Sequence, residues 1–149
     1  MSNLKLLINI TILLVAGAIA CTKDTLSPPD PAQSVAGIYQ AQVNSMPFPI
    51  KGGNITLTIR SVTKDTAEVS LRTILNGQLE DSLTYKRAFV AQQINRTSVN
   101  EGCINYIIYL TPSKESNLLT VTCSEKNIIS YLYTPAGQQE EAVIKFKKI

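Results

Sequence analysis

The chain has 149 residues and a formal net charge of +3, and it contains no histidine. This length suits one domain, because two compact domains would each be unusually small. The lack of histidine excludes Ser-His-Asp and Cys-His catalysis as well as histidine-ligated zinc. The small positive charge argues against a nucleic-acid partner, since proteins that bind nucleic acids usually cluster lysine and arginine.

The N-terminus has the pattern of a secretory signal peptide. Lys5 supplies one positive charge, and residues 6–20 are uncharged and mostly aliphatic. This stretch is shorter than the roughly 20 residues that a membrane-spanning helix needs. Small residues then lead directly into Cys21. We therefore expect export by a signal peptide that is cleaved before this cysteine; the alternatives are an ordinary signal peptide with an incidental cysteine and an uncleaved anchor.

Cys21 lies in a segment that resembles a bacterial lipobox, with Ala18 and Ala20 at the other two matching positions. The resemblance implies cleavage before Cys21 and a diacylglycerol group on its sulfur, so that acyl chains such as palmitate anchor the protein in a membrane. Thr22 stands where an inner-membrane retention signal would place aspartate. The resemblance therefore favours an outer-membrane lipoprotein, on the periplasmic or the cell-surface side.

The residues after Cys21 include three prolines among small polar residues. Such a composition favours an extended tether that does not join a hydrophobic core. We therefore expect three parts: a signal peptide at 1–20, a lipidated tether at 21–34 and a folded β-barrel domain at 35–149.

From residue 35 onward, apolar residues alternate with polar ones or form short runs, without the spacing of an amphipathic helix. Turn-forming residues separate these runs. The pattern predicts an all-β domain with strands near residues 36–44, 54–62, 66–74, 79–90, 103–111, 117–124, 127–134 and 141–148. Eight antiparallel strands at this spacing indicate a single barrel or a sandwich.

The hairpin around Asn76-Gly77 allows two registers. A two-residue turn would set apolar side chains opposite polar ones. A three-residue loop at 75–77, with a G1 bulge at its glycine, would shift the register by one residue and place Val69 opposite Leu83 on an apolar face. We expect the second register because it matches the apolar pattern.

The stretch 103–111 carries apolar residues on both faces of the expected strand, with Ile107 and Tyr109 facing away from the Ile104 series. Such a strand is either covered on both sides or exposes a patch that binds a partner. We expect burial on both faces.

Cys103 and Cys123 remain as an even pair if Cys21 carries lipid, and an exported protein can hold a disulfide. They fall on consecutive expected strands, where antiparallel pairing would bring them within the separation that a disulfide needs. We expect a disulfide between them; the alternative is two buried free thiols. A catalytic thiol is not expected, because no histidine is present to activate one.

Tyr85 and Arg87 are the candidate ligand-binding residues. Both are in phase with Leu83, which we place on the inner face of the sheet. An inward arginine can hold a carboxylate or phosphate by a bidentate contact, and tyrosine adds a polar group to an apolar wall. We expect an internal pocket of roughly a few hundred Å³ with Tyr85 on its wall. The alternatives are an Arg87 beyond the rim or a bulge, and a packed core.

Asp24-Thr25-Leu26 and Asp65-Thr66-Ala67 resemble the short O-glycosylation motif of exported Bacteroidota proteins, so Thr25 and Thr66 are candidate modified residues. Gly37-Ile38-Tyr39 lies at the first expected strand, where lipocalins carry Gly-x-Trp. With the lipobox, these features make the chain resemble a small lipocalin-like lipoprotein of the Bacteroidota. The resemblance implies an eight-stranded antiparallel barrel with room for one small ligand.

No acid, base or nucleophile converges in this pattern, because adjacent carboxylates such as Glu80-Asp81 point to opposite faces of a strand. The sequence also lacks a calcium loop and a phosphate loop. We expect a non-enzymatic, lipid-anchored envelope protein that uses no cofactor and binds a small apolar or amphipathic ligand in its barrel. The alternative is a protein-binding or structural envelope module with a filled core.

Overall fold

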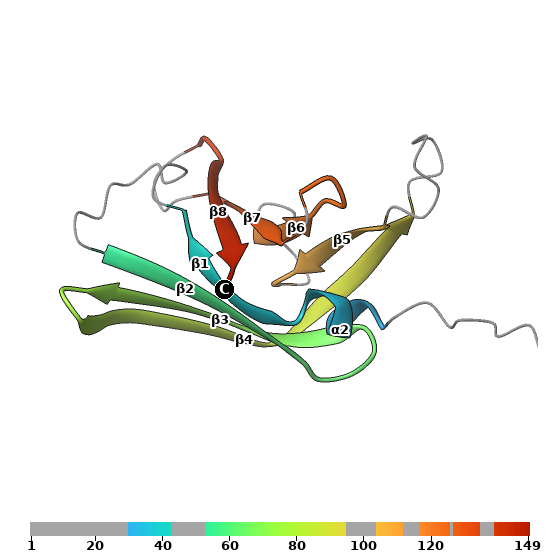
Figure 1. Ribbon diagram of the computed structural model, residues 1–149, viewed down its shortest axis with the longest axis horizontal. Coiled ribbons are helices and arrows are strands. Elements are labelled where there is room, and N and C mark those ends of the chain that lie inside the picture. Colours follow the sequence, from blue (N-terminus) through green and yellow to red (C-terminus); the bar gives the residue numbers. More distant parts are fainter. Residues whose placement is uncertain (1–29, 43–52, 95–103, 112–116, 126, 135–138) are drawn as a thin grey trace, which may run out of the picture.

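The computed structural model describes residues 30–42, 53–94, 104–111, 117–125, 127–134 and 139–149. Within these residues, eight antiparallel strands follow one another around a closed barrel, and the last strand pairs with the first (Figure 1). The elements are α2 (Pro31–Val35), β1 (Gly37–Ala41), β2 (Gly53–Ser61), β3 (Thr66–Leu75), β4 (Gln78–Ile94), β5 (Ile104–Tyr109), β6 (Asn117–Val121), β7 (Ile128–Tyr133) and β8 (Ala142–Lys148). The expected eight-stranded all-β fold is confirmed, and the closed ladder makes it a barrel.

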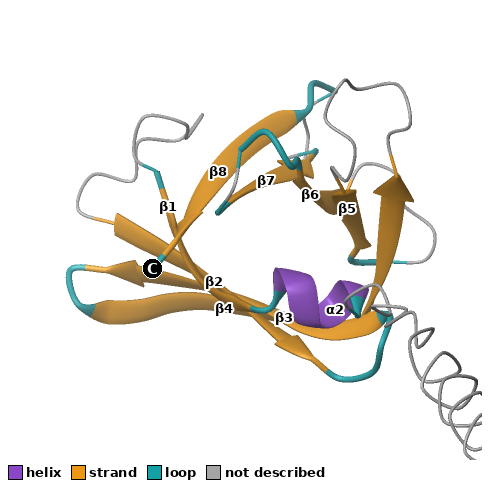
Figure 2. Cartoon of the chain, turned by 45° about the vertical axis from the view of Figure 1, so that its right-hand side comes forward, coloured by secondary structure: helices purple, strands orange, loops and turns teal. Residues whose placement is uncertain are grey.

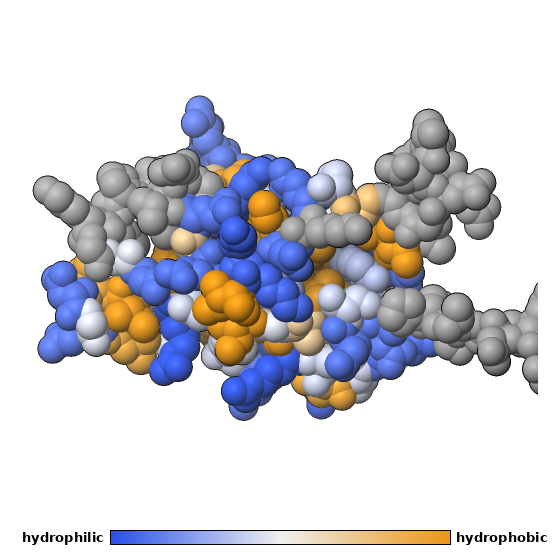
Figure 3. Space-filling view, viewed as in Figure 1, coloured by the Kyte–Doolittle hydropathy of each residue, from blue (hydrophilic) through white to orange (hydrophobic). Residues whose placement is uncertain are grey.

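Side chains along β2 alternate between the barrel interior and its outer wall. Ile55, Leu57 and Ile59 are buried, whereas Thr56 and Thr58 between them are only half-buried. This period of two follows from strand geometry, because successive side chains point to opposite faces. The outer face seen in Figure 3 is largely hydrophilic, with small separate apolar groups. The alternation therefore sorts apolar side chains into the interior.

The turn between β3 and β4 contains two residues, so the expected three-residue loop is wrong. Asn76 and Gly77 have φ values of 50° and 81°, and Leu75 pairs directly with Gln78 across the turn. Positive φ at both central residues is characteristic of the type I′ turn, whose twist matches that of the flanking strands. Asn and Gly tolerate this conformation better than other residues, which explains their position.

A bulge in β4 then restores the apolar face that the longer loop was expected to create. The register shifts between Thr73 and Ile74, which leaves Glu80 as an extra residue in β4. Beyond this bulge, Val69 lies opposite Tyr85 instead of its expected partner. An inserted residue exchanges the two faces of the strand beyond it. Val69 and Leu83 therefore lie on the same face, as expected, although they are not direct partners.

The short helix α2 occupies one end of the barrel, here called the helix end (Figure 2). Ala32 and Val35 are almost completely buried, and the Ala32 N–H donates to the carbonyl oxygen of Lys64 at 3.1 Å. Residues three apart share one face of a helix, so both side chains cover the interior. Pro31 suits the first turn, where its missing N–H costs no hydrogen bond. The expected tether boundary at residue 34 is therefore too late, because the packed domain begins with α2.

Contacts around Gly37 fasten β8 and α2 to β1. Gly37 has a φ of 154°, and a Cβ there would lie 2.6 Å from Cε of Lys148. The Lys148 ammonium donates to the Ala36 carbonyl at 2.9 Å and lies 5.6 Å from the centre of the Tyr39 ring. The Tyr39 hydroxyl donates to the Val35 carbonyl at 2.8 Å. A side chain at this position would strain the backbone and displace the end of the Lys148 side chain, so glycine favours these contacts.

Candidate ligand site at the tyrosine end of the barrel

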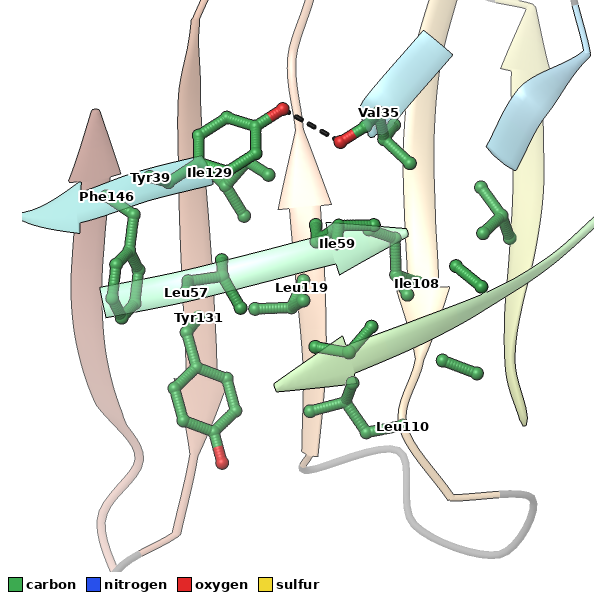
Figure 4. Close-up of a cluster of buried hydrophobic side chains, with 14 of the residues drawn as sticks. Val35, Tyr39, Leu57, Ile59, Ile108, Leu110, Leu119, Ile129, Tyr131 and Phe146 are labelled. Carbon is green, nitrogen blue, oxygen red and sulfur yellow. Dashed lines mark hydrogen bonds between the residues drawn. The ribbon is translucent and has the colours of Figure 1, made fainter. Parts of the chain in front are cut away.

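Buried side chains fill the barrel interior between the helix end and the middle of the strands (Figure 4). Each strand contributes to this core: Tyr39, Leu57, Val69, Val90, Ile108, Leu119, Ile129 and Phe146. In Figure 4, Val35 lies at one end of this core and Tyr131 at the other. These side chains form one buried cluster, and the expected internal pocket with Tyr85 on its wall stays a prediction.

A hydrogen-bonded network of three side chains spans this second end, here called the tyrosine end. The Asn117 side-chain amide N–H donates to the Tyr85 hydroxyl at 3.2 Å, and the Tyr131 hydroxyl donates to the side-chain Oδ1 of Asn117 at 2.7 Å. Tyr85 lies on β4, whereas Asn117 and Tyr131 lie on β6 and β7, so the network crosses the interior. Sequence reasoning identified Tyr85 but missed Asn117, because only the closure of the barrel brings these strands together.

Apolar surface lies beside this network. The Tyr133 ring stacks on that of Tyr131, with ring centres 5.0 Å apart. Leu71 and Tyr85 are partly buried against the core, and Leu83, directly opposite Leu71, is 45% exposed. Apolar walls with a few polar groups are the usual composition of a small-molecule site. The tyrosine end therefore has an amphipathic lining, whereas α2 covers the helix end.

Burial favours the neutral form of Tyr131 and of its stacking partner Tyr133. Burial is the main cause of the raised pKa of Tyr131, and the neighbouring Tyr85 and Tyr133 raise it further. Burial also raises the pKa of Tyr133. A phenol that stays protonated presents a donor and an acceptor without a charge. The site can therefore bind the polar part of a neutral or amphipathic ligand.

A buried hydroxyl without a hydrogen-bond partner among the described residues lies just after β5. The Oγ1 atom of Thr111, which follows β5, has no hydrogen-bond partner among the described residues. The preceding residue, Leu110, donates its N–H to the main-chain carbonyl of Asn117 at 3.4 Å, so the end of β5 adjoins the network. Buried polar groups usually have a partner, and an unsatisfied one in a native protein calls for an explanation. Thr111 therefore adds unused hydrogen-bonding capacity near the tyrosine end.

Arg87 is exposed beyond a bulge, so the alternative for this residue holds and it does not line the interior with Tyr85. A second register shift between β3 and β4 follows Tyr85, and it leaves both Lys86 and Arg87 on the outside. Ala88 is the next buried residue of β4. A bulge breaks the alternation by one residue, so extrapolating the phase from Leu83 assigns Arg87 to the wrong face.

Tyr39, at the helix end, makes the stability of the barrel sensitive to alkaline pH. Burial raises the pKa of its hydroxyl from 10.0 to about 12. Above about pH 10 the unfolded chain loses a proton that the folded chain keeps, so stability is complete below that pH and falls toward pH 12. We expect urea titrations to show this fall, with a smaller slope for Tyr39→Phe. Equal slopes in both proteins would exclude Tyr39 as a cause.

The other candidate residues lie largely outside the described part of the chain. Cys21, Thr25 and Cys103 are not among the described residues, so lipidation, modification at Thr25 and the disulfide stay predictions. Cys123 is half-buried just after β6, and its N–H donates to the Asn105 side chain at 2.9 Å. Among the described residues, no helix has the length and apolar character needed to cross a membrane.

Thr66 is less accessible than expected for a modification site. It is half-buried at the start of β3, and its hydroxyl forms a 2.6 Å hydrogen bond with that of Thr63. Thr63 also donates to Asp65, so the whole turn is internally hydrogen-bonded. Its modification stays a prediction.

The outer wall of the barrel carries a row of apolar side chains. The outer face of β5 is only half-buried at Ile107 and Tyr109, so the expected burial on both faces does not hold. The strand register aligns Tyr109 with outward side chains on its neighbours, which gives the apolar row Phe89, Tyr109, Leu118, Leu132 and Val143. Its two end members, Phe89 and Val143, are 48% and 41% exposed. Such a row is a candidate protein-binding surface.

No family model matches the chain, and no curated protein or solved structure matches it. In the described part of the chain, no three cysteine, aspartate or glutamate side chains gather as metal ligands.

Proposed function

We propose that this protein is a non-enzymatic, lipid-anchored envelope protein that binds one small amphipathic ligand at the tyrosine end of its barrel. The Tyr85–Asn117–Tyr131 network is the observation that carries the proposal. Three neutral polar groups from three strands meet there beside half-exposed leucines, which is the composition expected of a site for a partly apolar molecule.

The form of the barrel supports a ligand at its mouth. The described core occupies the interior toward the helix end, and α2 covers that end. An eight-stranded barrel has an interior just wide enough to be filled by side chains or to hold one small ligand. A ligand at the tyrosine end would place its apolar part against Leu71 and Leu83 and its polar part on the network. Thr111 would be a further partner for it.

Anchoring is the second part of the proposal, and the sequence supports it. The lipobox-like segment ends at Cys21, and the described domain begins at Asp30. Two or three acyl chains would hold the protein stably, because a single chain gives only reversible binding. The short connection would keep the barrel near the outer membrane. An amphipathic molecule from that membrane is therefore the expected class of ligand.

The ligand can be sought by native mass spectrometry of the full-length protein, extracted in native membrane discs so that no detergent competes. We expect a small molecule to remain bound, and a fluorescent fatty acid to displace it. Asn117→Leu removes both hydrogen bonds of the network, and Tyr85→Phe removes one. We expect the affinity for the probe to fall by about tenfold in Asn117→Leu and less in Tyr85→Phe.

Tyr109→Phe is the matched control, because it removes a tyrosine hydroxyl from the outer wall and leaves the tyrosine end unchanged. It should bind the probe like the unaltered protein. A protein that carries no small molecule and binds no probe would contradict the proposal. Equal binding by the Asn117→Leu variant and the control would remove the network from the site.

A protein-binding module is the second candidate function, and the apolar row favours it. The ring of Phe89 stacks on that of Tyr109 with centres 6.3 Å apart, and both lie on the outer wall. Aromatic side chains of this kind are enriched at protein interfaces. In the same mass-spectrometry experiment, a retained protein that is lost on Phe89→Ser, with no small molecule bound, would favour this candidate.

A further inference from the structure

A polar groove lies on the outer wall of β2, β3 and β4, separate from the tyrosine end. It is a hollow of about 280 Å³. Seven side chains from these strands line it: Thr58, Arg60, Glu68, Ser70, Arg72, Ser82 and Thr84. All of them are hydroxyl-bearing or charged, so the lining of the groove is mainly polar.

The strand register brings these residues together on one face. Ser70 lies opposite Thr58 on one side and Thr84 on the other, and Arg72 lies opposite Ser82. The bulge at Glu80 creates the β4 side of the groove, because the register of the turn alone would place Ser82 opposite an inward leucine. Bulges often re-aim side chains in this way near functional sites.

Side-chain length explains the hollow. Residues with short side chains form its floor along the row through Ser70, and the Ser70 hydroxyl bonds that of Thr84 at 3.1 Å. Arg60 and Arg72 stand in the rows on either side of this floor, and both are exposed. Long side chains therefore flank short ones on an otherwise continuous sheet. The hydroxyls at the floor still have hydrogen-bonding capacity, since each can donate once and accept twice.

The charges of the groove favour an anion. Two guanidinium groups face one carboxylate, that of Glu68, which lies opposite Arg60 in the register. Arg72 has only neutral partners across the sheet, Thr56 and Ser82. Among the described residues, the ion pair within 4.0 Å is Lys145–Glu125, so both arginines are free of carboxylates at that distance. A guanidinium fork is suited to bidentate binding of carboxylate or phosphate.

We propose that this groove binds a sugar that carries an acidic group, as a carboxylate or a phosphate ester. Arg72 and Arg60 would hold the acidic group, and the hydroxyls of Ser70 and Thr84 would bond those of the sugar. Glu68 would accept a hydrogen bond from a sugar hydroxyl. The polar lining selects against the ligand class proposed for the tyrosine end, so the two sites are independent.

Saturation-transfer NMR on the full-length protein in native membrane discs tests this site. The probes are galacturonic acid, glucose 6-phosphate and uncharged glucose. Both acidic sugars should bind, and glucose should bind about tenfold more weakly or worse. Arg72→Gln should lower the affinity for the acidic sugars by about tenfold or more, because it removes a charge-assisted contact. Thr84→Val should lower it less, since it removes one neutral hydroxyl and keeps the side-chain shape.

Lys147→Gln is the control, because Lys147 is an exposed cation on β8, a strand that does not line the groove. It should leave sugar binding unchanged, and so should Tyr85→Phe at the tyrosine end. A trimer of galacturonic acid that binds more tightly than the monomer would indicate a polymeric source, and equal binding a free sugar. Equal binding of glucose, displacement by inorganic phosphate at the same affinity, or no effect of Arg72→Gln would overturn the proposal.

Discussion

Replacing Phe146 by alanine is expected to lower the free energy of unfolding by about 3–5 kcal/mol. Phe146 lies on β8 with none of its surface exposed, and it is the largest of the fully buried side chains among the described residues. The change removes the transfer free energy of the ring and leaves a cavity between β1, β7 and β8. These strands cannot collapse into it easily, because each is held by ladders on both sides.

A loss of this size is a large part of the stability of an ordinary domain, which is about 5–15 kcal/mol. Guanidinium unfolding, followed by far-UV circular dichroism, measures it. Val143→Ala is the control, because Val143 lies on the same strand but faces outward and is 41% exposed. It should change the stability by about 1 kcal/mol or less. Similar losses of unfolding free energy in the two variants would mean that the buried face of β8 contributes no more to stability than its outer face.

Replacing Cys21 by serine is expected to abolish membrane anchoring of the mature protein. Serine has no sulfur to carry diacylglycerol, so the variant is either released from the membrane fraction or left unprocessed with its signal peptide. Without acyl chains, the described domain offers a bilayer the apolar row and separate exposed apolar side chains such as Ile38 and Val62. Cell fractionation and the incorporation of labelled palmitate measure the effect.

Ser27→Ala is the control for this experiment, because it changes a residue of the same expected tether but keeps Cys21 and the lipobox-like segment. It should be labelled with palmitate and should fractionate with the membrane. Normal acylation and fractionation of the Cys21→Ser variant would refute the lipobox. Loss of label from both variants would point to a folding or export defect, which the level of total protein would show.

Much of the barrel could be predicted from local patterns. Alternation along 54–62 places Leu57 inside and Thr58 outside, because strand geometry sets a period of two whatever the strand pairs with. Turn residues such as Asn76-Gly77 mark where strands end. These signals depend only on neighbouring residues, so they can be recognised without knowledge of the fold.

The sequence by itself therefore determined the number and order of the strands and the inner face of regular strands such as β2, and the tertiary structure decided what depends on register. The bulges in β4 put Arg87 outside and Ser82 beside Arg72, because an extra residue is accommodated wherever packing against β3 is best. The helical turn at Pro31–Val35 is too short to show a period, and the burial of Ala32 and Val35 at the barrel end stabilises it. Asn117 meets Tyr85 only across a closed barrel, since strands separated by β5 come together through curvature and not through any local pattern.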